Sequence, residues 1–132
     1  MNRRKLYSLF SILLLLTGCG GAININNKVV SVSSGQFVYQ DGNLISNYKA
    51  DVNSVWAACE KTIIELKAKD LQKERKISTG KIKANLQEEK VTIYVEYIAT
   101  NLTAVSVFVG VAGNNIASRL IHDKIANYLN KP

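Results

Sequence analysis

The feature that most constrains the fold is a series of short segments, between residues 79 and 109, in which apolar and polar side chains alternate. In the first segment Ile82, Ala84 and Leu86 alternate with Lys81, Lys83 and Asn85, and in the second Val91, Ile93, Val95 and Tyr97 alternate with Thr92, Tyr94 and Glu96. This period of two is typical of a β-strand with one buried face. The connections at 78–80 and 87–90 are too short for parallel neighbours, which need a crossover of about a dozen residues. The pattern therefore predicts an antiparallel sheet.

Four further strands are predicted around this series. Residues 104–109 are more continuously apolar, as expected in the middle of a sheet. Asp41-Gly42 is a two-residue loop of the kind that type I′ hairpins prefer, and it lies between the segments 36–40 and 43–49. Pairing across this loop places Tyr39 opposite Leu44. Residues 71–77 form a weaker, mostly charged candidate strand.

Two helices are predicted from the spacing of apolar residues. The first covers about 52–68, behind Asp51 as N-cap, and its stripe comprises Val52, Val55, Trp56, Cys59, Ile63 and Leu66. We expect Trp56 and Cys59 to be buried where this helix meets the sheet. The second follows Asn114 or Asn115, with a stripe of Ile116, Leu120, Ile121, Ile125, Tyr128 and Leu129.

Each amphipathic helix needs an apolar surface to cover, and the sheet supplies one. The predicted fold class is therefore α+β, a two-layer sandwich in which two helices cover one face of an antiparallel sheet. The expected element order is β-β-α-β-β-β-β-α. Residues 36–132 are expected to form this single domain.

The N-terminal segment differs in character from the rest of the chain. Arg3, Arg4 and Lys5 precede an apolar run over 6–16, and Leu16-Thr17-Gly18 leads into Cys19. A charged start, a short apolar run and small residues are the layout of a signal peptide. The run has 11 residues, whereas a membrane-spanning helix needs about 20. An ordinary cleaved signal is the alternative reading.

The segment resembles the signal peptide of bacterial lipoproteins. Leu16-Thr17-Gly18-Cys19 fits every position of their lipobox, the short motif that ends in the acylated cysteine. The resemblance implies that residues 1–18 are removed and that Cys19 is acylated, which anchors the protein to a membrane. Gly20 stands where the enterobacterial sorting rule places Asp for inner-membrane retention, so the resemblance implies the outer membrane, facing the periplasm. Residues 19–35 are then the acylated cysteine and a flexible tether rich in Gly, Asn and Ser, although 28–32 could form a short strand.

The mature chain also resembles one family of short bacterial lipoproteins, catalogued only as a domain of unknown function. The resemblance rests on the lipobox and on residues spread over the mature chain: Val38-Tyr39, Gly42-Asn43-Leu44, Tyr48, Val55-Trp56-Ala57-Ala58, Thr103, Val105, Val107, Val109-Gly110, Gly113-Asn114, Ser118, Ile121, Ile125 and Leu129. These are mostly packing and turn residues. The resemblance supports the fold and the envelope address, and it implies no activity and no catalytic residues.

A concentration of positive charge lies between residues 67 and 83. Seven basic residues occur there against two acidic ones, which gives this stretch a net charge of +5. The net charge of the whole chain falls from +7 to +4 when the three basic residues of the signal are removed. The stretch therefore carries more positive charge than the entire mature chain. Lys81 and Lys83 share the outward side of one predicted strand, and we expect Lys73, Arg75 or Lys76 on the neighbouring strand to join them. Lys73, Arg75, Lys81 and Lys83 are therefore candidate contacts for an anionic lipid or cell-wall polymer. A solvated charged face is the alternative reading.

The sequence offers no catalytic constellation. His122 is the only histidine and is expected at the surface or half-buried, beside the apolar stripe. Cys59 lies within an apolar stripe, where a cysteine behaves as a small hydrophobic residue. No metal site is expected, because the further ligands are missing.

These observations predict a lipid-anchored, non-enzymatic envelope protein that acts as a scaffold or accessory module for another envelope component. The alternative is a small-ligand-binding or envelope-sensing module that uses a cleft between helices and sheet, with a basic face towards anionic lipid or polymer. No cofactor is expected. No nucleic-acid partner is expected, because the predicted location lies outside the cytoplasm.

Overall fold

The computed structural model describes residues 37–131. Its elements, in chain order, are β1 (Val38–Gln40), β2 (Asn43–Tyr48), α2 (Val52–Glu65), β3 (Lys69–Arg75), β4 (Thr79–Leu86), β5 (Glu89–Ala99), β6 (Leu102–Val109) and α3 (Asn115–Asn130). The strands form one six-stranded sheet in the order β1-β2-β6-β5-β4-β3, and all neighbours are antiparallel. The predicted fold class and element order are confirmed. The predicted signal peptide 1–18 and the tether 19–35, with Cys19, lie outside the described residues.

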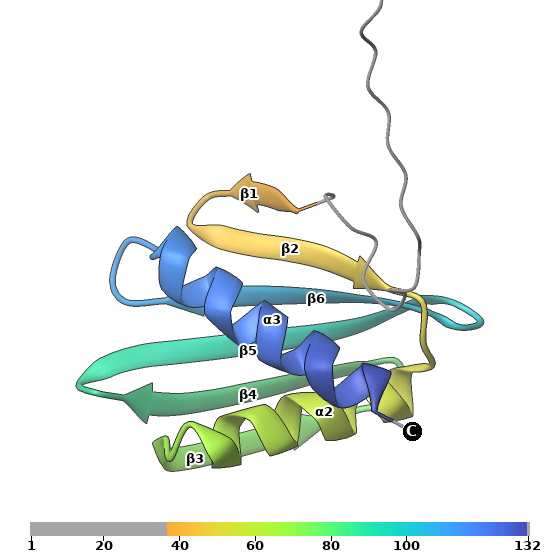
Figure 1. Ribbon diagram of the computed structural model, residues 1–132, viewed down its shortest axis with the longest axis horizontal. Helices are drawn as coiled ribbons and strands as arrows, with labels where there is room; N and C mark the ends of the chain where they lie inside the picture. Colours follow the sequence, from red (N-terminus) through yellow and green to blue (C-terminus); the bar gives the residue numbers. More distant parts are fainter. Residues whose placement is uncertain (1–36, 132) are drawn as a thin grey trace, which may run out of the picture.

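Both helices lie on the same face of the sheet (Figure 1). α3 packs over β2 and β6, α2 packs over β4, β5 and β6, and the two helices also contact each other. α2 carries the chain from β2 to the far edge of the sheet, where β3 begins, and the strands β3 to β6 then return to β2. The described chain is therefore a two-layer structure with one covered and one open sheet face.

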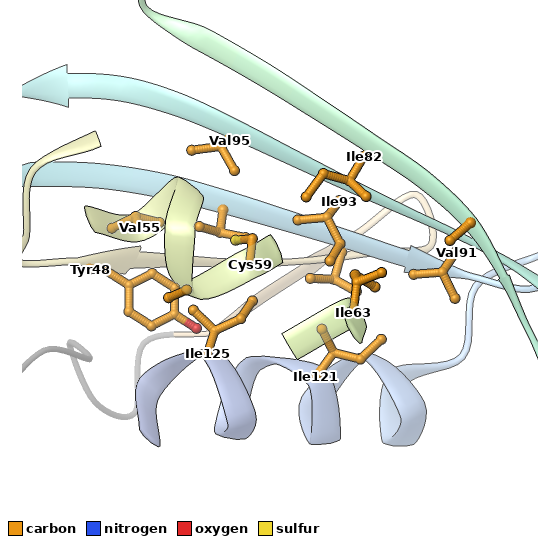
Figure 2. Packing of buried hydrophobic residues seen from close by; sticks show 14 of the residues in the cluster. Tyr48, Val55, Cys59, Ile63, Ile82, Val91, Ile93, Val95, Ile121 and Ile125 are labelled. Carbon is orange, nitrogen blue, oxygen red and sulfur yellow. The ribbon is translucent and has the colours of Figure 1, made fainter. Parts of the chain in front are cut away.

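The core fills the space between the two layers. Ile82, Ile93 and Val107 on the sheet are fully buried, as are Cys59 on α2 and Ile125 on α3. Figure 2 shows side chains of both helices and of the strands meeting in this layer. The alternation read in the sequence is confirmed, because Val91, Ile93 and Val95 face the helices while Tyr94 and Glu96 are exposed.

The first hairpin has the predicted turn. Asp41 and Gly42 have φ angles of 53° and 83°, as a type I′ turn requires, and Tyr39 pairs with Leu44. Gly42 is also needed for space, since a Cβ there would lie 2.4 Å from the ring of Phe108. This glycine joins the hairpin to the end of β6.

Asp51 caps α2 as predicted. Its Oδ1 accepts hydrogen bonds from the amides of Asn53 and Ser54, at 3.0 and 2.9 Å. Hydrogen bonds from Ser54, first that of its hydroxyl, hold the pKa of Asp51 below its usual value. The helix ends at Glu65, earlier than the predicted 68, because Lys67 takes a left-handed conformation with a φ of 58°.

The apolar stripe predicted for the last helix is partly wrong. Ile116 and Leu120 are 85% and 53% exposed, and Ser118 and His122 are buried in their place. α3 can turn this side towards the core because both polar side chains find hydrogen-bond partners there. The hydroxyl of Ser118 donates to the carbonyl of Val107 at 3.3 Å. A satisfied polar group can be buried at little cost.

β3 also differs from its predicted position, starting at Lys69 and ending at Arg75 rather than covering 71–77. A bulge between Lys69 and Gln72, where Asp70 has a φ of 55°, shifts its pairing with β4. Every residue of this edge strand is exposed. Charged side chains on an exposed edge discourage pairing with another chain.

Candidate functional site

One face of the sheet, which we call the open face, is covered by no other element of the described chain (Figure 1). Paired residues of adjacent strands point to the same face, so its composition follows from the register. One row across the sheet pairs Ile45 with Ser106, Ser106 with Tyr94, and Tyr94 with Lys81. Phe108 and Ala104 flank Ser106 along β6 on the same face.

The centre of the open face is apolar and its β4 side is cationic. Ile45, Ala104 and Phe108 are partly buried by their neighbours, and Tyr94 is 37% exposed. Lys81 and Lys83 alternate along β4 with the buried Ile82. Aromatic residues surrounded by a polar rim are typical of protein–protein interfaces.

The predicted basic patch is divided between the two faces, which corrects the expectation from the sequence. Lys81 pairs with Glu74 and Lys83 with Gln72, so Glu74 and Gln72 are their cross-strand neighbours. Lys73 pairs instead with the buried Ile82, on the face that the helices cover. The shift of β3 by the bulge decides which side chains share a face.

Lys73 forms an ion pair with α2. Its Nζ lies 2.7 Å from Oε2 of Glu60, and both side chains are partly exposed. An exposed pair of this kind contributes at most about 1 kcal/mol. Lys73 therefore fastens the edge strand to the helix and is not a free cation on the open face.

Arg75 braces the turn between β3 and β4. Its guanidinium donates to the carbonyl oxygens of Lys76, Ile77 and Thr79, the last at 3.2 Å, and also to Oδ1 of Asn53 on α2 at 2.7 Å. The same group lies 5.6 Å from the centre of the Trp56 ring. Arg75 thus links a turn, a helix and an aromatic side chain, so its role is structural.

Trp56 is only partly buried, contrary to the expectation, while Cys59 is fully buried as expected. The indole covers Gly80 of β4, where a Cβ would lie 2.3 Å from the ring. Arg75 covers the indole from outside. Trp56 therefore lies at the edge of the core rather than within it.

Two shallow grooves are lined by residues of β3, β4 and β5, and Lys81 and Lys83 connect them with the open face. One, of about 280 Å³, is lined by Gln72, Lys73, Glu74, Lys81 and Lys83. The other, of about 360 Å³, is lined by Asp70, Gln72, Lys83, Ala84, Asn85, Lys90, Val91 and Thr92. Both contain an acidic side chain beside their lysines. The positive charge of this face is therefore smaller than the sequence predicted.

His122 is fully buried, so the expectation of a surface or half-buried position is wrong. Its Nε2 lies 2.8 Å from the carbonyl oxygen of Leu44, which can only accept, so Nε2 carries the proton. Its Nδ1 lies 2.7 Å from the hydroxyl of Tyr48, which donates to it. Burial is the main reason that the pKa of His122 falls to about 4.

This buried pair joins α3 to β2 and carries no further catalytic partner among the described residues. The hydroxyl of Tyr48 also lies 3.2 Å from the carbonyl oxygen of His122. Burial raises the pKa of Tyr48 and that of the Cys59 thiol. A buried thiol with a raised pKa is a poor nucleophile. Within 37–131 no group of three or more metal-binding side chains occurs.

The fold and its open face define the chain as a small α+β module whose two helices cover a single sheet face. The chain belongs to the family described as a protein of unknown function, DUF3568, whose model matches residues 4–128. This confirms the resemblance to a family catalogued only as a domain of unknown function. A comparison with curated proteins gives no match. In the part of the chain that the structure describes, no helix is long and apolar enough to cross a membrane.

Proposed function

We propose that this protein is a lipid-anchored, non-enzymatic envelope protein that binds another envelope protein through the open face of its sheet. The address is inferred from the N-terminal segment and the binding mode from the sheet. The two parts rest on separate observations and are tested separately.

The lipobox supports the anchor. Leu16-Thr17-Gly18 before Cys19 satisfies each position of the motif, and the family match extends to residue 4, so it takes in this segment. Two or three acyl chains on Cys19 would hold the protein at the membrane in an effectively permanent way. Gly20 favours the outer membrane, facing the periplasm.

The single observation that carries the binding mode is the asymmetry of the sheet. α2 and α3 cover one face over β2, β4, β5 and β6, while no element within 37–131 covers the other, on which Ile45, Tyr94 and Phe108 lie. The side chains between the layers are packed and buried, so a ligand cleft between helices and sheet is disfavoured. A partner protein would bury the apolar centre of the open face and leave its lysines at the rim.

Photo-crosslinking in intact cells tests the binding mode. We expect a photoreactive residue in place of Tyr94 to give a discrete adduct with one envelope protein. The matched control replaces Ile64, which is 67% exposed on α2. Equal adducts from both positions, or none from Tyr94, would contradict binding through the open face.

Substitution of the anchor residue tests the address. Cys19→Ser should abolish lipid labelling and leave a precursor of about full length, because the diacylglycerol is attached to the Cys19 thiol before cleavage. Mass spectrometry of the membrane fraction measures both effects. Normal maturation of this variant would show that the protein is an ordinary secreted protein.

A second candidate function is contact with an anionic polymer or lipid, and the grooves favour it. Lys81, Lys83 and Lys90 line them, against Glu74 and Asp70. Residues 20–132 should then bind lipopolysaccharide weakly, and high salt should weaken this binding by screening. Lys81→Gln with Lys83→Gln should remove most of it, whereas Lys61→Gln on α2 should not. Equal binding by both variants would exclude this candidate.

A further inference from the structure

Two turns lie together at one end of the sheet and expose apolar side chains. The β3–β4 turn carries Ile77, which is 96% exposed, and the end of β5 carries Tyr97 and Ile98, which are 44% and 48% exposed. The amide of Tyr97 donates to the carbonyl of Ser78 at 2.8 Å, so the two segments are joined. We call Ile77, Tyr97 and Ile98 the apolar tip. Figure 1 shows the turn that follows β5 projecting beyond the rest of the sheet.

The apolar tip is held in place. Arg75 donates to the carbonyl groups of the turn that bears Ile77, and Asn53 of α2 accepts from the same guanidinium. Such bracing removes the entropy that a mobile loop would lose on binding. An almost fully exposed isoleucine on a braced turn has no role in the core of this domain.

The charges around the apolar tip favour an anionic surface. Lys76 directly precedes Ile77 in the β3–β4 turn. Lys49 directly follows Tyr48, the last residue of β2, which pairs with Thr103 of β6, and Thr103 in turn pairs with Tyr97 of the apolar tip. The nearby acidic groups, Glu96 and Asp51, keep their negative charge, and Arg75 in the same turn adds a third positive charge to the two lysines. Cations close to an anionic bilayer are attracted to it.

The length of the segment between Cys19 and the domain is compatible with this orientation. Phe37 lies beneath the guanidinium of Arg119, 4.2 Å from it and near the start of α3, and Val38 pairs with Ile45 in the middle of β2. The first described residues therefore lie at neither end of the sheet. Cys19 lies 18 residues before Phe37, so a tether of this length keeps the domain within roughly 20–25 Å of its anchor on average.

We propose that the apolar tip docks on the anionic phospholipid surface of the membrane that holds the Cys19 anchor. This inference rests on the proposed lipid anchor. Tethering raises the effective concentration of the surface to the order of millimolar, so three apolar side chains and two lysines suffice for docking. The strands then stand upright on the membrane, and the open face remains accessible from the side.

An environment-sensitive fluorophore on an introduced cysteine tests the docking. The full-length lipidated protein suits this labelling, because acylation blocks Cys19 and Cys59 is fully buried. The probe is attached to Ile77→Cys after reconstitution into vesicles of phosphatidylethanolamine and phosphatidylglycerol. We expect blue-shifted emission and quenching by lipids that carry a spin label near the headgroup. The matched control is Val111→Cys, which is 100% exposed after β6, at the other end of the sheet, and should remain in water.

The outcomes separate this inference from the proposed anchor. Failure of the protein to float with vesicles would refute the anchor itself. If the protein floats with vesicles but the probe at position 77 stays in water, or a probe at position 111 is quenched instead, docking by the apolar tip is refuted while the anchor stands. A blue shift at position 77 without vesicles would show that a second copy covers the tip. Lys76→Gln should weaken docking about fivefold in anionic vesicles and leave it unchanged in phosphatidylcholine.

Discussion

The buried His122 should make the stability of the domain depend on pH, and the structure gives both sign and size. In the folded protein the pKa of His122 is about 4, against an ordinary value of 6.5, chiefly because burial disfavours the charged ring. Between these values the unfolded chain binds a proton that the folded chain does not. Unfolding therefore becomes easier as the pH falls from about 6.5 towards about 4, and the effect levels off below.

The magnitude follows from the difference between the two pKa values. One pKa unit corresponds to about 1.4 kcal/mol, so His122 alone should remove about 3 kcal/mol of unfolding free energy over this range. The hydrogen bond with the Leu44 carbonyl and the charge of Asp123 raise the pKa of the ring, whereas the charge of Arg119 lowers it. Burial outweighs the two raising effects, since the pKa falls to about 4.

Urea unfolding of residues 20–132, followed by the fluorescence of Trp56, measures this dependence. His122→Gln is the matched control, because the amide can donate to Leu44 and accept from Tyr48 without titrating. We expect the wild type to lose about 3 kcal/mol more than the variant between pH 6.5 and pH 4. Parallel curves for the two proteins would refute the buried neutral histidine.

Three further predictions concern packing and turns, each measured as a change in unfolding free energy at neutral pH. Gly42→Ala should destabilise the domain by about 1–3 kcal/mol through its contact with Phe108, and an unchanged stability would contradict that packing. Trp56→Ala should cost about 2–3 kcal/mol, less than the roughly 3–5 kcal/mol of a fully buried aromatic, and a larger cost would indicate complete burial. Glu88→Gly should raise the unfolding free energy of the domain by about 1 kcal/mol, because Glu88 has a φ of 70°, which glycine tolerates better. A lower unfolding free energy would mean that the Glu88 side chain stabilises the fold.

The sequence by itself determined the elements and the fold class. Alternation along β4 and β5, the Asp41-Gly42 turn and the cap at Asp51 are local signals, because each depends on residues that are neighbours in the chain. The short connections then excluded parallel pairing. The lipobox around Cys19 is equally local, and its anchoring role stays a prediction.

Only the tertiary structure decided which side chains meet. The bulge at Asp70 set the register of β3 and moved Lys73 and Arg75 away from Lys81, a result that no local pattern could contain. Similarly, α3 buries His122 rather than Leu120, because the carbonyl of Leu44 and the hydroxyl of Tyr48, more than 70 residues away in sequence, satisfy the imidazole. Partners distant in sequence decide whether a polar residue can be buried, since an unsatisfied polar group in the core costs more than an exposed leucine.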